Sequence, residues 1–448
     1  MKKSLMVQLL SVALLMLGCS PKPEDLPQFS NADISKLMTK VTEVMVHDVT
    51  NPPLAARFFA YINLSAYEVM AQHDTSLNSM HGTLNVFPKI IAPEAANYSP
   101  SLSAILAMMH TASKVQPSGS MILDFEQQFL DSCLELGYTE EIILQSKKYG
   151  EEVSKQLLAY VSEDGYNKIS NFPKYTPVEG KGYWYPTPPA YFAAVEPHFN
   201  TVRTLTLDSA SQFKPAPPVA FSEDKNSPYF KMLMEVYEEG KELPLEHRKI
   251  ASFWDCNPFA MEKSGHLMVG LKKISPGAHW IGITGIACDK AGKSFSEAVK
   301  IHTVVAVGLM DAFISCWDEK YRSNRIRPET AIRKYIDPTW EPLLQTPPFP
   351  EYTSGHSTIS GAAAVILTHY FGDNFSFTDD VEVSYGIPAR DFPSFITAAK
   401  EAAVSRLYGG IHYRDANENG TAQGLKIGEW VINRVEKEKA MPVAIDQH

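Results

Sequence analysis

An all-α fold is predicted from three features of this 448-residue sequence. Apolar residues recur with helical spacing through most of the chain, in segments long enough to form helices. The period-two alternation that indicates strands is nearly absent. Several periodic segments begin with a helix-capping pattern, of which Ser294-x-x-Glu297 is the clearest. We therefore expect helical bundles, with no internal sequence repeat.

The N-terminus predicts export from the cell. Two lysines are followed by an apolar run and then by Gly18-Cys19, so residues 1–18 are predicted to be a signal peptide. A cysteine after a small residue resembles a bacterial lipobox, which predicts lipidation of Cys19 and a tether over residues 19–30. We expect a cell-envelope lipoprotein, or a secreted protein if the cysteine stays free. No later segment is predicted to supply the ~20 apolar residues of a membrane span, so membrane contact is expected through the lipid anchor only.

Residues 31–225 are predicted to form an N-terminal helical region with a long loop segment. Helices are expected at 32–49, 54–73, 101–115, 119–136 and 139–163. Asn51-Pro52-Pro53 separates the first two helices, because proline ends one helix but suits the first turn of the next. Residues 165–225 are rich in Pro, Tyr and Gly without periodicity. Their frequent aromatic residues indicate an ordered loop over the helices instead of disorder.

Residues 226–448 are predicted to form a C-terminal helical bundle. Helices are expected at 228–241, 245–254, 264–274, 278–288, 294–323, 356–371, 391–407 and 420–437. A proline-rich connection spans 337–350. Arg327 precedes Pro328, which disfavours helical backbone at the arginine, so Arg327 is expected to project from an extended segment after the helix.

Composition limits the classes of function. Hydrophobic content of 44% and charged content of 21% are typical of a globular protein. The net charge of −10 argues against nucleic-acid binding, and it makes the cationic cluster at residues 320–327 conspicuous. Four cysteines follow Cys19, and their disulfide pairing is left open: Cys133, Cys256, Cys288 and Cys316. No CxxC pattern occurs, which argues against a zinc site of that type.

Ser354-Gly355-His356 precedes a predicted helix rich in Gly and Ala. Serine is a good N-cap, and glycine lets the backbone approach a ligand closely. The first turn of a helix presents unpaired N–H groups and partial positive charge, which favours an anion. A histidine there adds a proton donor at the same place.

Two further motifs supply cations at predicted helix ends. Lys320 and Arg327-Pro328 lie upstream, and Ser405-Arg406 is followed by His412. Arginine forks match the oxygens of a phosphate-like anion, and lysine acts as a point charge. Taken singly, such residues are usually solvated helix ends or ordinary caps. Their combination predicts a pocket for a tetrahedral oxyanion at converging helix ends in the C-terminal half.

The three motifs together resemble the signature shared by vanadium-dependent haloperoxidases and a superfamily of acid and lipid phosphatases. Thr353 stands where these proteins usually have proline. Asp415 follows the last histidine by three residues instead of four, which leaves its role in orienting His412 open. The long stretch before Lys320, together with Phe253–Pro258 and Pro347–Tyr352, resembles bacterial haloperoxidases, particularly those that oxidise iodide.

The resemblance implies an all-α vanadium haloperoxidase fold and a vanadate cofactor. It implies that His412 is the metal ligand, and that His356 is the acid–base group. The vanadate oxygens would be held by Lys320, Arg327, Ser354, Gly355 and Arg406, with Lys320 also polarising bound hydrogen peroxide. The substrates would be hydrogen peroxide and a halide, iodide being favoured over bromide, with Trp317 and Phe349 lining the halide approach.

Two alternatives remain open on the sequence. In an acid phosphatase of the same superfamily, His412 would form a phosphohistidine and His356 would protonate the leaving alcohol. A non-enzymatic surface-binding lipoprotein is the third candidate, although sugar binding needs no converging cations. The other histidines show no metal-binding spacing and are expected to pack or face solvent, His279 among them. Residues 289–294 mimic part of a phosphate loop but are interpreted as a helix cap.

Overall fold

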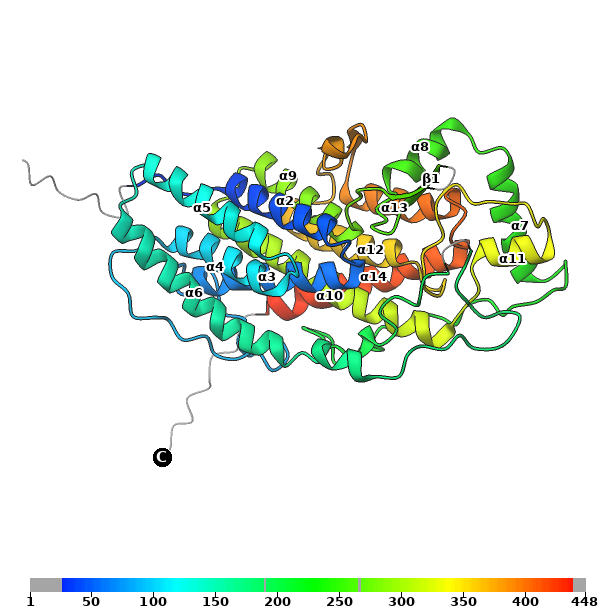
Figure 1. Ribbon diagram of the computed structural model, residues 1–448, viewed down its shortest axis with the longest axis horizontal. Helices are drawn as coiled ribbons and strands as arrows, with labels where there is room; N and C mark the ends of the chain where they lie inside the picture. The colour runs from blue at the N-terminus through cyan, green and yellow to red at the C-terminus, as the bar shows by residue number, and fades with distance from the viewer. Residues whose placement is uncertain (1–25, 189–190, 265–266, 438–448) are drawn as a thin grey trace, which may run out of the picture.

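The computed structural model describes residues 26–188, 191–264 and 267–437, and within these ranges the prediction of an all-α fold is confirmed (Figure 1). The signal peptide over residues 1–18 and the lipidated Cys19 lie outside the described residues. The boundary predicted near residue 226 stays a prediction.

Five helices form the N-terminal part: α2 (Asn31–His47), α3 (Pro52–Met70), α4 (Pro100–Val115), α5 (Ser120–Glu135) and α6 (Glu140–Ser162). Their bounds lie within three residues of the prediction. Asn51 caps α3 by accepting from the Leu54 N–H, and Pro52 occupies the first turn. Apolar faces of these helices join one large core that continues into the C-terminal helices.

The segment between α6 and α7 is an ordered loop, as predicted, with two short 3-10 turns, η2 (Tyr166–Asn171) and η3 (Phe199–Thr201). Buried Asp311 on α10 accepts hydrogen bonds from the backbone N–H groups of Leu205 and Thr206 at 2.7 and 2.8 Å. Trp184 is buried, whereas its neighbour Tyr183 is exposed. The loop is therefore fastened to the bundle along its length.

Eight helices form the C-terminal part: α7 (Pro228–Lys241), α8 (Leu245–Phe253), α9 (Pro276–Lys290), α10 (Phe295–Ser323), α11 (Pro328–Tyr335), α12 (Gly355–Phe371), α13 (Phe395–Tyr408) and α14 (Arg414–Val435). The capping box predicted for α10 is present, with Ser294 and Glu297 exchanging hydrogen bonds. Arg327 has extended backbone and caps α11, as the following proline requires.

Four predictions of secondary structure are wrong in detail. The helix predicted over residues 264–274 is not found in the described part of this stretch. An antiparallel hairpin stands there, β1 (Met261–Ser264) with β2 (Leu267–Gly270), because two glycines in this short stretch weaken a helix. A second hairpin, β3 (Phe377–Asp379) with β4 (Arg390–Phe392), delays the start of α13, and the short turn η4 (Val383–Tyr385) lies between its strands. Helix α11 was not predicted. Helix α14 begins at Arg414, six residues before its predicted start at residue 420.

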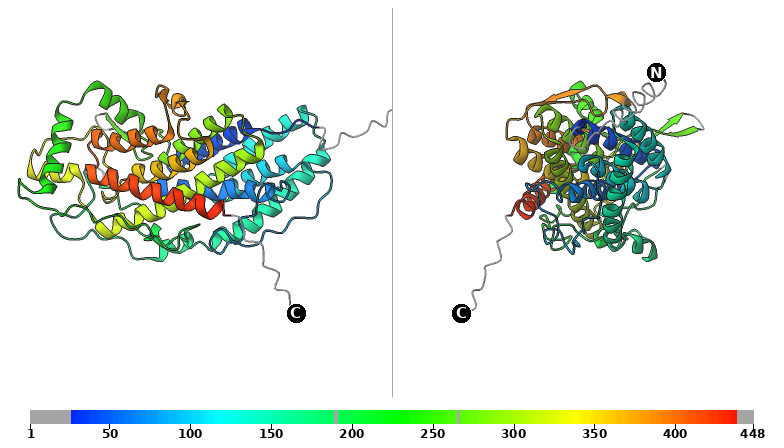
Figure 2. Two further views of the ribbon diagram at one scale, coloured as in Figure 1. Left: turned by 180° about the vertical axis from the view of Figure 1, so that it is seen from behind. Right: turned by 90° about the vertical axis from the view of Figure 1, so that its left-hand side faces the viewer.

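Helix α10 runs through the middle of the molecule and packs against α3, α9, α12 and α14 (Figures 1 and 2). It is long and apolar enough to cross a membrane by composition, with a mean hydropathy of 1.5, which corrects the expectation that no later segment is. However, 94% of that apolar window is buried against other parts of the protein, as in the central helix of a bundle.

Helices α12 and α14 pack more extensively than any other pair in the described part of the chain, and glycines make this possible (Figure 2). A Cβ on Gly424 would lie 1.9 Å from the Thr358 carbonyl oxygen, and one on Gly361 would lie 2.7 Å from the Thr421 oxygen. The backbones therefore touch directly. This contact places the N-terminus of α12 beside that of α14, where Ser354 N–H donates to the Ala416 carbonyl at 3.1 Å.

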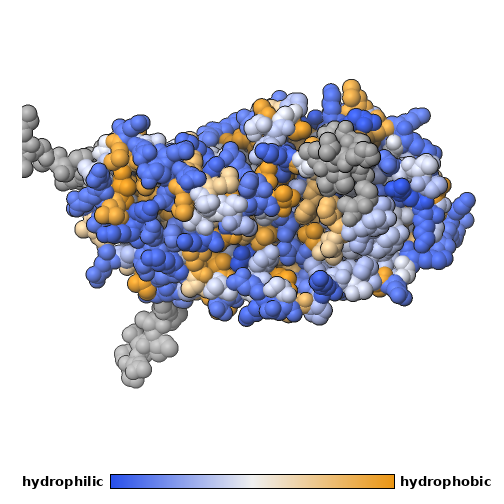
Figure 3. Space-filling model, in the orientation of Figure 1, coloured by the Kyte–Doolittle hydropathy of each residue, from blue (hydrophilic) through white to orange (hydrophobic). Residues whose placement is uncertain are grey.

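The four cysteines after Cys19 are free thiols and all are buried. On the face shown in Figure 3, hydrophobic side chains form separate groups among hydrophilic ones. The stability of the described fold thus rests on helix packing.

Replacing Gly424 by alanine is expected to destabilise the protein, because the added methyl group overlaps the Thr358 carbonyl of α12. Overpacking of this kind costs about 1–3 kcal/mol. Gly277→Ala on α9 is the matched control, since its Cβ would meet nothing closer than 3.9 Å, and we expect it to be neutral or slightly stabilising. Urea unfolding of both variants measures the difference; equal midpoints would contradict the close α12–α14 contact.

Candidate active site

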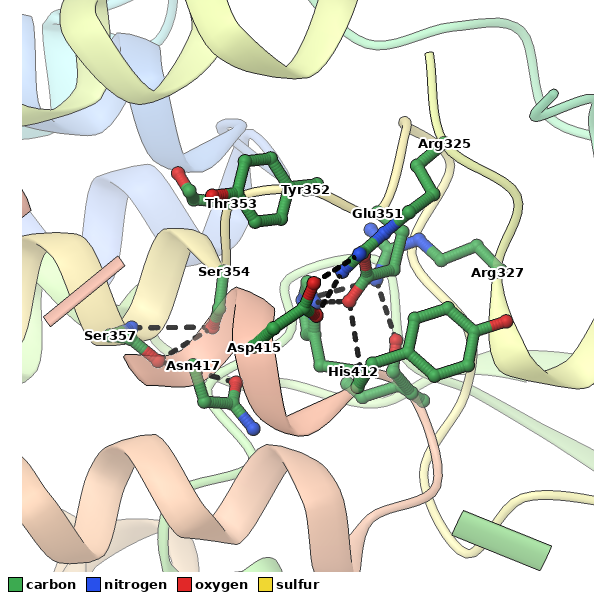
Figure 4. Close-up of polar contacts among 12 residues, drawn as sticks. Arg325, Arg327, Glu351, Tyr352, Thr353, Ser354, Ser357, His412, Asp415 and Asn417 are labelled. Atoms are coloured by element: carbon green, nitrogen blue, oxygen red, sulfur yellow. Dashed lines mark hydrogen bonds and ion pairs between the residues drawn. The ribbon is translucent and has the colours of Figure 1, made fainter. Parts of the chain in front are cut away.

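The ends of several helices meet in the C-terminal half of the molecule (Figure 4). Lys320 lies in the last turn of α10, and Arg327 caps α11. Ser354 caps α12, and Arg406 lies in the last turn of α13. His412 follows in the short connection to α14. Sequence positions 92 residues apart are thus brought together as predicted.

Lys320 is fully buried, and its ammonium group is held by backbone carbonyls of one loop. It donates to the carbonyl oxygens of Pro350, Glu351 and Thr353 at 3.1, 3.2 and 2.5 Å. Burial, with a smaller contribution from Arg327, lowers the pKa of Lys320 to about 7, although Cys316 and Glu351 oppose the shift. Burial therefore makes the charged form of Lys320 less stable than it would be in water. A nearby anion would stabilise the charged form.

Arg327 is also fully buried, and its guanidinium lies between the same loop and the connection after α13. Its Nε donates to the Phe349 carbonyl at 2.9 Å, and its Nη1 donates to the Ile411 carbonyl at 2.9 Å and to His412 Nε2 at 3.1 Å. Burial lowers the pKa of Arg327 to about 10.

His412 is a neutral imidazole with a defined tautomer. Because an arginine N–H can only donate, the His412 Nε2 atom facing Arg327 must be the acceptor. The Nδ1 atom therefore carries the ring proton, and it donates to Glu351 Oε1 at 2.8 Å. Burial lowers the pKa of His412 well below its ordinary value, as does the charge of Arg327. A lone pair on Nε2 thus points into the cationic cluster, as a metal ligand requires.

Glu351 and Arg325 were not identified as site residues by the sequence. Glu351 is completely buried, and its Oε1 also accepts from the Tyr413 backbone N–H at 2.9 Å. Its Oε2 pairs with Arg325, whose two terminal nitrogens form a fork on Asp415 at 2.6 and 2.7 Å. In the described part of the chain, Asp415 hydrogen-bonds to Arg325. The carboxylate that orients His412 is Glu351. The position of Glu351 just before Ser354-Gly355-His356 is the signal that could have suggested it.

Ser354 caps α12 by accepting from the Ser357 N–H at 3.4 Å, and its Oγ also accepts from the Ser357 hydroxyl at 2.8 Å. His356, in the first turn, has a buried Nε2 atom without a hydrogen-bond partner. Its pKa is lowered well below the ordinary value, first by burial and then by Arg406 and His412. Gly355 packs near Trp317, which would lie 3.4 Å from an added Cβ.

Arg406 links this region to α8. Its Nη2 donates to the Trp254 carbonyl at 2.6 Å and to the Ala251 carbonyl at 3.4 Å, both at the C-terminal end of α8. Burial lowers its pKa. A pocket opens beside it, and it is lined by four of the predicted residues, Gly355, His356, Arg406 and His412. Lys320, Arg327 and Ser354 are not among its lining residues.

Aromatic side chains complete the pocket wall. Trp317 and Phe349, the two residues predicted for the halide approach, both line it, with ring centroids 4.9 Å apart. Phe349 also contacts the two buried cations, because Lys320 Nζ and the Arg327 guanidinium each lie 5.0 Å from its ring centroid. The pocket is thus apolar on one side and rich in hydrogen-bond donors on the other.

This arrangement suits a multiply charged oxyanion. Three buried cations, the N–H groups at the start of α12 and the partnerless His356 Nε2 are all donors or potential donors. The imidazole lone pair of His412 Nε2 is aimed among them. A tetrahedral oxyanion whose central atom accepts an imidazole ligand, as vanadium does in vanadate, matches this set.

Known proteins show the same architecture. Residues 334–439 match the family described as the VCPO second helical-bundle domain. A curated relative, vanadium chloroperoxidase of Curvularia inaequalis, is 26% identical over 170 residues, which cover 27% of this chain and 28% of that protein. A bacterial vanadium-dependent chloroperoxidase, solved in its holo form, superposes with a TM-score of 0.67 at 15% identity, covering 86% of this chain and 93% of its own. That likeness shows the fold.

A solved bacterial vanadium-dependent iodoperoxidase is much more similar. It is 43% identical, superposes with a TM-score of 0.85, and the match covers 91% of this chain and 97% of that one. Identity of this level over nearly the whole length, together with the converging motifs, establishes the family. The chain belongs to the vanadium-dependent haloperoxidases.

Proposed function

We propose that this protein oxidises iodide with hydrogen peroxide and that His412 binds its vanadate cofactor. The observation that carries the proposal is a neutral imidazole whose Nε2 lone pair faces a buried group of cations. The 43% identical relative is an iodoperoxidase, which supports iodide as the halide. Vanadate supplies, when bound, a Lewis-acid centre that activates hydrogen peroxide for attack by halide.

Each predicted residue has a role that its surroundings support. Gly355, His356 and Arg406 line the pocket, and the Arg406 guanidinium and the N–H groups at the start of α12 would hold oxyanion oxygens directly. Lys320 and Arg327 would reach the anion by exchanging part of their bonds to carbonyls, since each is held by several such acceptors. Ser354 fixes the first turn of α12 in place.

His356 is the proposed acid–base group. Burial and the neighbouring cations keep its imidazole neutral, so it can accept a proton from hydrogen peroxide at the pocket surface. An anion bound among the cations would offset their repulsion and raise the proton affinity of His356. The histidine would then release the proton to the leaving hydroxide equivalent.

The aromatic wall favours iodide over smaller halides. The ring carbons of Trp317 and Phe349 form no strong hydrogen bonds, so they cannot replace the water molecules that a small anion loses on entering the pocket. Iodide is the largest and least strongly hydrated of the common halides, and the positive ring edges attract it. Loss of water on entering the pocket therefore costs least for iodide.

We also propose export and lipid anchoring through Cys19, which rest on the N-terminal sequence. In a bacterial host, labelled fatty acid is expected to be incorporated into the wild-type protein and not into Cys19→Ser. The variant should appear in the soluble envelope fraction. Unlabelled wild-type protein in the cytoplasm would contradict this prediction.

The purified protein, loaded with vanadate, is expected to oxidise iodide in the presence of hydrogen peroxide. His412→Ala should lose at least about 100-fold in rate, because the residue supplies the only ligand to the metal from this set. Triiodide absorbance measures the product, and a phosphate-ester assay on the same samples tests the phosphatase alternative. Phosphate release without peroxide-dependent iodide oxidation would overturn the proposal, as would full activity of the variant.

Glu351→Gln is expected to weaken vanadate binding about 10–100-fold, the usual effect of losing a group that orients a ligand histidine. Glutamine can still accept from His412 Nδ1, but it removes the charge that polarises the imidazole. Asp415→Asn is the matched control, because it removes a carboxylate from Arg325 without touching His412. Each vanadate-free variant is titrated with vanadate, and the recovered activity at each concentration gives its affinity for vanadate. Equal effects would show that Glu351 acts only through Arg325.

A further inference from the structure

Three potential metal ligands outside the catalytic motifs meet in the core. Cys256 Sγ lies 3.3 Å from His279 Nδ1 and 3.1 Å from Glu382 Oε1, and the two latter atoms are 3.1 Å apart. All three residues are buried. They come from the connection after α8, from α9 and from the connection after β3, so their separations of 23 and 126 residues form no recognisable motif.

The triangle formed by these atoms has the size of a metal-binding face. With sides of 3.1–3.3 Å, its corners lie about 1.8 Å from its centre, slightly less than the roughly 2.0–2.3 Å of zinc–ligand bonds. A metal ion would therefore sit just above the plane of the three atoms. Three such bonds form the base of a tetrahedron and leave a fourth position for a water molecule.

The surroundings resemble those that hold ligand histidines in metal sites. His279 Nε2 contacts Asp379 Oδ2 at 2.8 Å, and the other oxygen of this carboxylate accepts from the Val381 N–H at 3.2 Å. A carboxylate on the second ring nitrogen fixes the tautomer that presents Nδ1 as a ligand. The ring is also stacked on Trp254, with centroids 4.8 Å apart. The orientation of the His279 ring is thus fixed by Asp379 at Nε2 and by Trp254 on its face.

We propose that Cys256, His279 and Glu382 bind one divalent metal ion of borderline softness, with Zn²⁺ as the best match. A thiolate and an imidazole favour zinc over magnesium or calcium, which prefer oxygen ligands. The charges of one thiolate and one carboxylate balance a divalent cation, which suits a site buried from solvent.

The alternative is a metal-free cluster, in which the Cys256 thiol donates to Glu382 and the imidazole bridges the two carboxylates. Burial, and then Glu382, raise the pKa of Cys256 to about 12, so the thiol keeps its proton in that state. Metal binding would displace that proton, which makes the two states distinguishable by spectroscopy.

The site would hold the wall of the catalytic pocket in place. Cys256 lines that pocket, and Trp254, two residues earlier, supplies the carbonyl that accepts from Arg406. A metal bridging this connection to α9 and to the segment after β3 would fix the position of the carbonyl, and so of the Arg406 guanidinium. The ion is therefore assigned a positioning role.

The test uses the full-length mature chain, free of vanadate, expressed in medium supplemented with CoCl₂ or ZnCl₂. We expect about one Co²⁺ or Zn²⁺ per chain by elemental analysis, and a thiolate-to-cobalt charge-transfer band in the cobalt protein. Cys256→Ser should remove the band, and Glu382→Gln should lower the metal content. Cys288→Ser, which changes another buried free thiol, should leave both unchanged.

Metal content below about 0.1 per chain in the supplemented wild type would overturn the proposal. Cobalt binding without a charge-transfer band would also overturn it, because Cys256 would then not be a ligand. These two measurements on the wild type decide the question even if a variant fails to fold. Since vanadate and halide are absent, the outcome is independent of the proposed catalytic function.

Discussion

Burial of three cations at helix ends is the constraint on which the rest of this structure depends. Lys320, Arg327 and Arg406 are each removed from water, at a cost that unpaired charges inside a protein cannot sustain. The loop from Phe349 to Thr353 turns its carbonyl oxygens toward the first two cations, and the end of α8 does the same for Arg406. The carbonyl oxygens of these segments take the place of water around the three cations. Because they carry only partial negative charge, they stabilise the cations without neutralising them.

Glu351 is a carboxylate beside Lys320 and Arg327, and its hydrogen bonds limit how much of their charge it neutralises. Its two oxygens are taken up by Arg325, by His412 Nδ1 and by the Tyr413 N–H. The carboxylate therefore stabilises the far side of the imidazole and leaves the Nε2 side facing cations. Close packing of α12 on α14 supports the same arrangement, because glycines let the N-termini of both helices reach this point together.

Much of this was accessible from the sequence, because it depends on local rules. Caps and proline effects determine where α10 ends and why Arg327 has extended backbone. The convergence of the three motifs was inferred from their complementary chemistry and from their position at predicted helix ends. Residues 264–274 were misassigned because a short apolar stretch suits a helix or a hairpin equally well. Glu351 was missed because its contacts with Arg325 and His412 span 26 and 61 residues and follow from tertiary packing alone. The Cys256, His279 and Glu382 cluster was inaccessible for the same reason.

Arg406 belongs to the cationic group, and the cluster of Cys256, His279 and Glu382 lies near enough to affect its pKa. Burial lowers the pKa of this arginine, and Asp255, then Cys256 and Glu382, oppose the shift. If that negative charge stayed uncompensated, it would compete with an oxyanion for the same guanidinium. A divalent cation bound to Cys256 and Glu382 would cancel the charge of Glu382 and leave more of the Arg406 charge available to an oxyanion. The metal site and the oxyanion site would then be linked by electrostatics as well as by the Trp254 carbonyl, since each becomes easier to fill when the other is occupied.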